Sequence, residues 1–507
     1  MAMDYSLCIL SVVVFIEKRV REDMDLRLLT RDTGFSYRHL REVFRECTRM
    51  TLARYALSRR VAHAAFDIMH TGKSLTEIAG EYGFETYDTF SRAFRRETGI
   101  VPSLFRKTNI VVGRKRLAAG AYGPAVLPDG IGVPVKKLPE AEKMTKDVGK
   151  TVDSCILYGV PKVEYKYDEC TPFPSCLKAC LNYMGQQADY SALMAASGAA
   201  FRLRWNVDRW DGGNVDIQYV YEDPQEAFRR SFQAVGREAR MLTRKNSSKE
   251  QFKAFIRDEI DHGRPVIALG IIGPPEACIL TGYAENGDTL LGWNFFQGNP
   301  EFDRERETHE CGYFIAHKWW ENECTSLLMA IGEESGAPAS IRQLLENAAD
   351  VLTKERIVIY DPDSSEKRVY AGGQAAFDAW AGAIGNDMEF PENAVLPLLF
   401  ERTMCQTDAQ TMVGEGRSHA SCWLQKMGDR YPEIRDLCMK AAQQFREAAE
   451  CTLEMHRIKG GFEQNEQNIR TLARPEIRKQ IVTLIKKAKQ HDHTACGYIQ
   501  SMLDILS

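Results

Sequence analysis

The sequence predicts a multidomain chain: an all-α head over residues 1–108, a mixed α/β (α+β) domain over 151–336 and a mostly helical part over 337–507. Three observations predict this division. Short amphipathic stretches fill residues 5–107, glycine and proline cluster in a linker at 109–150, and β-rich runs such as Val266–Ile272 alternate with helical patterns after it. The 507 residues provide for two to four domains at ~100–200 residues each.

Charge is distributed unevenly between the head and the rest of the chain. Residues 1–116 carry 21 Lys and Arg against 14 Asp and Glu, a net of +7, and the remaining residues carry a net of −11. A basic head on an acidic body suggests a polyanionic partner for the head. Chance variation of surface charge gives the same balance, so the charge alone does not decide.

The sequence indicates a cytoplasmic protein with neither a metal nor a cofactor. The longest apolar run near the start, Cys8–Ile16, has nine residues, and a membrane span needs ~18. The residues before it include Asp4 and no basic residue, which is atypical of a signal peptide. The 14 cysteines contain no C-x-x-C pair and stand near no histidine cluster, so no zinc site is expected.

A repeat inside the head predicts two helix-turn-helix units. Each copy has a Gly-Phe pair followed by two apolar residues four positions apart, which lie on one helix face. The copies are Gly34-Phe35 with Leu40 and Phe44, and Gly83-Phe84 with Phe90 and Phe94. The second copy opens with a capping box formed by Ser74 and Glu77.

The outward faces of the two predicted recognition helices are rich in arginine and polar residues. Such side chains suit the base edges and phosphates of a major groove, although most helix faces of this kind are simply solvated. The candidate DNA-binding residues are Tyr37, Arg38, Arg41 and Arg45 in the first copy, and Glu85, Tyr87, Asp88, Ser91, Arg92 and Arg95 in the second.

Residues 9–107 resemble the DNA-binding domain of AraC/XylS-type transcription regulators. The matching stretches are Phe15–Glu17, Gly34–Leu40, Arg59–Ala64, Ile78–Phe84, Phe90–Phe94 and Gly99–Arg106. The resemblance implies two helix-turn-helix units joined by a long helix, here about Leu52–Met69, that read adjacent major-groove segments. A DNA operator and RNA polymerase are the implied partners. Asp88 and Thr89 depart from the family pattern, which affects the bases read rather than the fold.

Cys176 is the first candidate residue of the second part. The prolines before it stop at 174, and Leu177, Cys180 and Leu181 then recur at helical spacing, so Cys176 is expected in the first turn of a helix. A helix N-terminus stabilises a thiolate, which suits a nucleophile. The alternative is a small buried side chain.

Residues 151–400 resemble papain-like cysteine peptidases, in particular the C39-like group and the amino-terminal domain of the butirosin-biosynthesis acyltransferase. The resemblance places Cys176 at the nucleophile and Asn294 at the orienting residue, with Glu276 where the general-base histidine is expected. A carboxylate beside a thiol raises the thiol pKa, whereas catalysis needs an imidazole. We therefore interpret the site as a disabled one, although His262 or His309 could fold in.

Aromatic residues near this site suggest a ligand pocket. Aromatic walls with one carboxylate suit a polar or cationic organic molecule. Trp293 adjoins Asn294 and is expected to face the cleft, and Trp205 and Trp210 flank a predicted loop over it. For each ring, the alternative is a place in the core.

These patterns predict a ligand-responsive transcription regulator in which the papain-like part is the sensor and the helical part completes it. The candidate ligand-binding residues are Cys176, Trp205, Trp210, Glu276, Trp293 and Asn294. One alternative is a cysteine-dependent acyltransferase or amidase fused to a DNA-binding unit. Another alternative is that the part after the head serves only oligomerisation. The helical residues after 336 are expected either to cover the cleft or to form a homodimer contact.

Overall fold

The structure is a computed structural model. It describes residues 12, 15–16, 19–21, 24–30, 35–48, 51–70, 73–98, 101–103, 146–166, 168–207, 210, 216–297, 307–360, 367–392, 394, 396–461 and 466–506. Gly34, Gly99 and most of the predicted linker lie outside these residues. Among the helices described, none is long and apolar enough to cross a membrane.

Within the described residues of the head, the longer helices are α3 (Tyr37–Thr48), α4 (Leu52–His70), α5 (Leu75–Glu81) and α6 (Tyr87–Thr98). The predicted capping box is present, because Ser74 Oγ accepts from the Glu77 amide and Glu77 accepts from the Ser74 amide at 2.7 Å. Gly83 makes the turn between α5 and α6 with φ at +72°, which glycine adopts without strain. The second helix-turn-helix is therefore confirmed in its local details.

Helix α4 connects two separate small cores in the head. Its first part packs Leu52 and Tyr55 against α3, where Leu40 and Phe44 point inward. Its later part packs with α5 and α6, and this second core contains Val61, Ala64, Ile68, Ile78, Phe90 and Phe94. The predicted long helix, about Leu52–Met69, is confirmed to within one residue.

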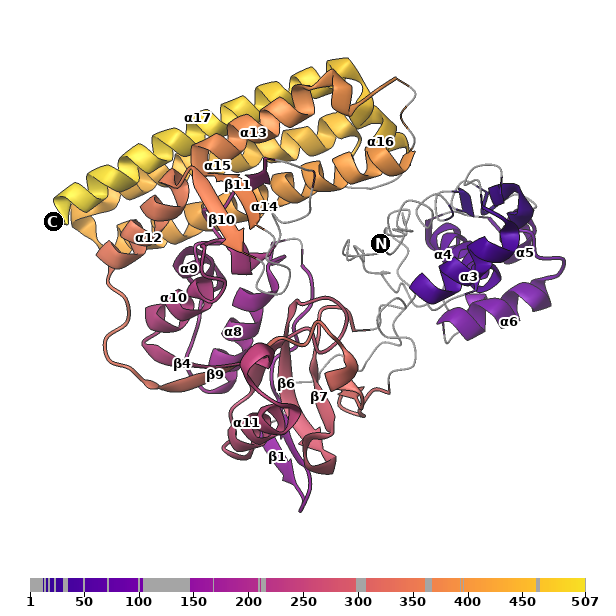
Figure 1. The fold of residues 1–507 in the computed structure, drawn as a ribbon, viewed down its shortest axis with the longest axis horizontal. Helices are drawn as coiled ribbons and strands as arrows, with labels where there is room; N and C mark the ends of the chain where they lie inside the picture. Colours follow the sequence, from indigo (N-terminus) through magenta and orange to yellow (C-terminus); the bar gives the residue numbers. More distant parts are fainter. Residues whose placement is uncertain are drawn as a thin grey trace.

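An eight-stranded antiparallel sheet forms the lower layer of the body in Figure 1. Its main path runs β1-β2-β6-β5-β9-β4, and β7 joins β6 to β8. The strands are β1 (Asp147–Lys150), β2 (Cys155–Tyr158), β4 (Arg237–Thr243), β5 (Val266–Leu269), β6 (Ala277–Ala284), β7 (Thr289–Trp293), β8 (Phe314–Ala316) and β9 (Leu327–Glu334). The β-rich runs predicted from the sequence are β5, β6 and β7. Since β1 begins at 147, the last four residues of the predicted linker belong to this sheet.

Four helices accompany the sheet: α8 (Pro172–Tyr183), α9 (Tyr190–Ala196), α10 (Glu226–Ala234) and α11 (Lys249–Asp261). Helix α8 packs on β5 and β6, and α11 packs on β2, β5 and β6. These strands are buried on both faces, with Val266, Ile267, Cys278 and Ile279 all fully buried. Burial on both faces explains why they read as continuous apolar runs rather than alternating ones.

A second sheet ties the middle of the chain to the helical part. Strands β10 (Arg356–Tyr360) and β11 (Lys367–Gly372) form an antiparallel pair, and β3 (Arg204–Asn206) adds to β11. Residues more than 160 positions apart thus share a ladder. This sheet therefore joins segments on both sides of residue 336.

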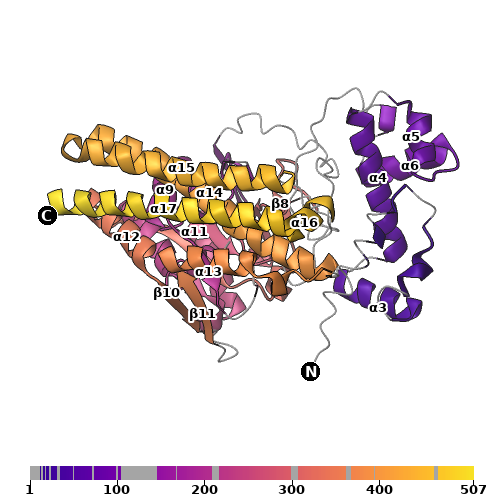
Figure 2. The ribbon, with the colours of Figure 1, turned by 90° about the horizontal axis from the view of Figure 1, so that it is seen from above.

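Long helices form the upper layer of the body (Figure 1), and they run side by side when seen from above (Figure 2). The helices are α12 (Ile341–Thr353), α13 (Gly373–Gly385), α14 (Leu396–Arg430), α15 (Arg435–Lys459), α16 (Glu466–Ala473) and α17 (Pro475–Ile505). The predicted helix start at Pro475 is confirmed. The largest core of the body combines sheet residues such as Val266 with Phe445 of α15 and Ile499 of α17. The parts on either side of residue 336 therefore share one core.

Candidate functional site

The exposed face of α3 carries three of the predicted DNA-binding arginines. Arg38, Arg41 and Arg45 are exposed, while Leu40, Val43 and Phe44 of the same helix are buried. The Arg41 guanidinium lies 5.8 Å from the centre of the half-buried Tyr37 ring. The Arg38 guanidinium pairs with the Glu42 carboxylate one turn later, at 3.1 Å. Within the described residues, Arg41 and Arg45 form no such ion pair.

Helix α6 presents a less basic face than α3. Asp88, Arg92 and Arg95 are exposed, Tyr87 and Ser91 are half-buried, and Glu85 is exposed just before the helix. Arg92 Nε donates to the Asp88 carbonyl oxygen at 3.3 Å. An acidic residue in the first turn of a helix stabilises it by complementing the helix dipole. Asp88 can therefore stabilise α6 as well as contact a base.

A buried carboxylate links the start of the head to its second unit. Asp67 of α4 is 4% exposed, accepts from Tyr82 Oη at 2.9 Å and pairs with Arg21 at 2.9 Å. Burial raises the pKa of Tyr82, so the phenol stays protonated and donates. This triad was absent from the sequence reasoning, because nothing in the spacing of residues 21, 67 and 82 indicates a contact.

In the body, Cys176 lies in α8 and is fully buried. The helix begins at Pro172 rather than after Pro174, so Cys176 lies in its second turn, which corrects the expected place in the first. Burial above all, then the neighbouring Cys180, Cys278 and Glu276, raise the pKa of the Cys176 thiol well above its ordinary value. A thiol in such surroundings stays protonated and is a poor nucleophile.

Glu276 lies directly before β6 and lines a small hollow in the body. Its other walls include Thr171, Phe173, Asp216, Phe228 and Pro275. Burial, and next the charge of Asp216, raise the pKa of Glu276 to about 7, while Arg202 acts in the opposite direction. Glu276 is also among the charges that act on the Cys176 thiol, and burial gives this carboxyl group an unusually high proton affinity.

Asn294 and Trp293 form hydrogen bonds with backbone groups in the core of the body. Asn294 Oδ1 accepts from the Phe296 amide at 2.7 Å, and Nδ2 donates to the Ile272 carbonyl oxygen at 3.4 Å. Trp293 is 2% exposed and its Nε1 donates to the Val160 carbonyl oxygen. This placement corrects the expectation that Trp293 faces the cleft, because the strand buries both of its faces.

Trp205 and Trp210 lie in another core, apart from the hollow. Their ring centres are 5.3 Å apart, and Trp205 stacks on Trp380 of α13. Trp210 Nε1 donates to Glu389, and the Arg402 guanidinium covers its ring. The pairing of β3 with β11 places these rings under the long helices, which corrects the expectation that they stand over the cleft.

Neither histidine considered as a replacement base contacts Cys176. His262 Nδ1 lies 2.6 Å from the Asp258 carbonyl oxygen, and His309 Nδ1 lies 3.0 Å from Cys311 Sγ. In the described parts of the chain, no side chain makes a hydrogen bond to the Cys176 thiol, and no cluster of side chains suits a metal ion.

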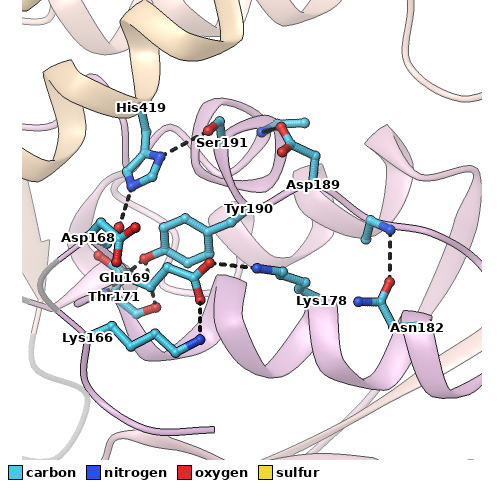
Figure 3. A network of polar contacts seen from close by, with 12 residues as sticks. Lys166, Asp168, Glu169, Thr171, Lys178, Asn182, Asp189, Tyr190, Ser191 and His419 are labelled. Carbon is cyan, nitrogen blue, oxygen red and sulfur yellow. Dashed lines mark hydrogen bonds and ion pairs between the residues drawn. The ribbon is translucent and has the colours of Figure 1, made fainter. Parts of the chain in front are cut away.

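A polar network at the start of α8 was missed by sequence reasoning. Glu415 of α14 accepts from the Thr171 amide at 3.1 Å, Tyr190 Oη at 2.7 Å and Thr171 Oγ1 at 2.8 Å. Figure 3 shows its surroundings, where His419 Nδ1 lies 3.0 Å from Ser191 Oγ. This network joins residues more than 220 positions apart, and no local sequence motif predicts it.

The comparisons with known proteins concern the head. A family described as a helix-turn-helix domain matches residues 29–108. The regulatory protein SoxS of Salmonella typhimurium is 30% identical over 104 residues, which make up 20% of this chain and 97% of SoxS. The HTH-type transcriptional activator AarP of Providencia stuartii is 32% identical over 95 residues, or 19% of this chain and 70% of AarP.

Two further matches cover the same part of the chain. The transcriptional regulator Rob of Salmonella typhimurium is 26% identical over 107 residues, or 21% of this chain and 37% of Rob. The crystal structure of the DNA-binding domain of AdpA with a target DNA matches with 25% identity and a TM-score of 0.19, over 20% of this chain and 89% of that chain. By its head, this chain belongs to the AraC family of DNA-binding transcription regulators.

Proposed function

We propose that this AraC-family regulator is controlled by a small molecule that binds in the body, and that the body is a disabled relative of papain-like cysteine peptidases. The proposed units are a DNA-binding head at 1–108, a linker at 109–150, a sensor at 151–336 and a helical part at 337–507 that completes the sensor. A second copy of the chain and RNA polymerase remain predicted partners, and the cytoplasm is the predicted compartment.

The observation that carries the proposal is the state of the groups around Cys176. The thiol is fully buried, its pKa is raised, and a carboxyl group stands near it where catalysis requires an imidazole. A thiol without a base neither loses its proton to a neighbour nor returns one to a leaving group. Chemistry at Cys176 is therefore disfavoured, and a binding role is the remaining use for this region.

The resemblance to papain-like peptidases finds support in the order and packing of three elements. Helix α8, which carries Cys176, packs on β6, and β6 pairs antiparallel with β5 and β7. Glu276 at the start of β6 and Asn294 after β7 come from neighbouring strands. This order is the one that the resemblance implies for nucleophile, base and orienting residue.

Glu276 supports the choice of an effector site over a role limited to oligomerisation. Its carboxyl group has no hydrogen bond or ion pair to any side chain within the ranges described, yet it lines a hollow. The side chain is half-buried. A partly desolvated carboxyl group without a partner costs free energy, which a bound molecule can recover. An effector that supplies the missing partner would change the stability of the body.

Operator binding by the full chain tests the proposal. An operator is first selected from random duplexes, and its affinity is then measured at fixed salt before and after bound small molecules are removed from the protein. We expect that adding the removed fraction back changes operator affinity at least tenfold in the wild type and less in Glu276→Gln. Glu334→Gln, at an exposed carboxylate 81% accessible, is the matched control.

Two results would contradict the proposal. Equal operator affinity with and without the removed fraction would refute the sensor and leave DNA binding intact. Amide or thioester turnover that vanishes in Cys176→Ala would establish the enzyme alternative instead.

A further inference from the structure

The two units of the head are joined at a second place besides helix α4. Helix α4 contributes to both small cores, and Figure 2 shows α3 near one of its ends and α5 and α6 near the other. The start of the chain also contributes to both, because Phe15 and Ile16 are buried in the first core and Val20 in the second. Leu29 then returns to the first core. The chain therefore makes its own connection between the units around Val20.

Arg21 adds a polar contact to this connection. Its Nη2 lies 2.9 Å from Asp67 Oδ2 of α4, and its Nε and Nη2 donate to Tyr82 Oη at 3.2 and 3.1 Å. Tyr82 Oη donates to the same Asp67 oxygen at 2.9 Å, so each of the three side chains bonds both of the others. Asp67 and Tyr82 are 4% and 1% exposed. Charge-assisted hydrogen bonds that are shielded from water in this way are stronger than neutral, solvated ones.

Tyr82 places this triad at the turn of the second helix-turn-helix. Tyr82 is the C-cap residue of α5, and Gly83, which makes the turn into α6, follows it directly. Helix α6 carries the exposed Arg92 and Arg95. The triad therefore ties the start of the head to the unit that presents α6.

The relative placement of α3 and α6 decides which DNA segments the two helices can contact together. Duplex DNA turns by about 34° and rises by about 3.4 Å per base pair, so two faces held at one distance and angle match one spacing. Helix α4 has 19 residues and is therefore about 28 Å long. Long helices bend, and a bend in this connector would displace α6 relative to α3. A second connection between the units restricts that displacement.

We propose that the Arg21–Asp67–Tyr82 triad is a positioning element for DNA recognition, which fixes α6 relative to α3 and thereby selects one spacing between two operator segments. This inference concerns the head alone and goes beyond control by an effector. A fixed arrangement lowers the ordering cost of binding the matching operator. It also disfavours operators with another spacing, because one of the two helices is then misplaced.

The affinity penalty for an altered spacing tests the proposal. An operator is selected from random duplexes with the full chain, footprinting locates the segments it protects, and one base pair is then inserted or removed between them. The penalty is the ratio of the dissociation constants for the altered and the selected operator at fixed salt. We expect at least tenfold for the wild type, because a misplaced recognition helix loses its base contacts. Arg21→Gln should lower the penalty to threefold or less and should bind the selected operator more weakly.

Two matched variants separate positioning from loss of charge and loss of stability. Arg27 is an exposed arginine near Arg21 that pairs with Asp25 at 3.1 Å, so Arg27→Gln removes the same charge and leaves the triad intact. Ile78 is fully buried in the second core, so Ile78→Val destabilises that unit and leaves the polar groups of the triad in place. Both variants should keep the wild-type penalty within twofold. Because the penalty is a ratio, a uniform loss of phosphate contacts cancels in it.

A further variant covers the case in which Arg21→Gln does not fold, since Asp67 then loses a charged partner while buried. The double variant Arg21→Gln with Asp67→Asn removes that buried charge, and the same fall in the penalty is expected. An unreduced penalty in Arg21→Gln or in the double variant would overturn the proposal, because α4 alone would then fix the two units.

Two other results would also overturn it. A wild-type penalty below twofold would show that α3 and α6 do not read one operator at a fixed spacing. A penalty that falls as far in Ile78→Val as in Arg21→Gln would make the stability of the second unit, rather than the triad, the cause. None of these results depends on whether an effector binds in the body.

Discussion

Replacement of Glu415 by glutamine should destabilise the body of the protein by about 3 kcal/mol. The carboxylate accepts from the amides of Cys170 and Thr171 and from Tyr190 Oη through one oxygen, and from Thr171 Oγ1 through the other. A glutamine oxygen can replace the first oxygen, but its hydrogen bonds are those of a neutral acceptor. Bonds to a charged group are worth ~1 kcal/mol more than neutral ones, and the three bonds to the first oxygen are each weakened by that amount.

The measurement is urea unfolding of the full chain followed by tryptophan fluorescence. The control is Glu450→Gln on α15, an exposed carboxylate for which a change within ~0.5 kcal/mol is expected. Tyr190→Phe removes one donor from the same carboxylate and should cost about 1.5 kcal/mol. If Glu415→Gln unfolds within 0.5 kcal/mol of the wild type, the carboxylate does not hold α14 on α8, and the reasoning from this network fails.

The remaining predictions concern DNA, the thiol and pH. Arg41→Ala, Arg92→Ala and Arg95→Ala should each weaken operator binding by ~1–3 kcal/mol at fixed salt, whereas Arg435→Ala on α15 should not; three unchanged affinities would remove these residues from the interface. Iodoacetamide should label the exposed Cys422 well before the buried Cys176, as read by peptide mass spectrometry. Labelling of Cys176 before Cys422 would contradict an inert thiol at Cys176. The folded-state pKa of Glu276 is about 7 against an ordinary 4.5, so the native state binds more protons between these values, and wild-type stability should fall as pH rises from 4.5 to 7. Glu276→Gln should lack this part of the pH dependence in urea unfolding series, and identical profiles would show that Glu276 does not titrate there.

The helix-turn-helix units of the head could be predicted from the sequence because most of the contacts that build them are local. The capping box at Ser74, the turn at Gly83 and the inward Phe90 and Phe94 lie within 21 residues of one another. Helical period and turn chemistry depend on residues three to ten positions apart, which a sequence displays directly. The three central strands of the body were predictable for a similar reason, since burial on both faces produces continuous apolar runs.

Which side chains meet in the body depends on contacts between elements that are distant in the sequence. The predicted aromatic wall was divided, because β3 pairs with β11 and carries Trp205 to the long helices, while Trp293 faces the core. The buried Arg202 and Glu415 carried no signal in the sequence, since a charged residue in a linear pattern is most often solvated. Their burial follows from contacts across more than 200 positions, such as the 2.8 Å bond from Thr171 to Glu415. Local patterns report the period of an element, whereas the partner of a buried charge depends on how distant elements pack.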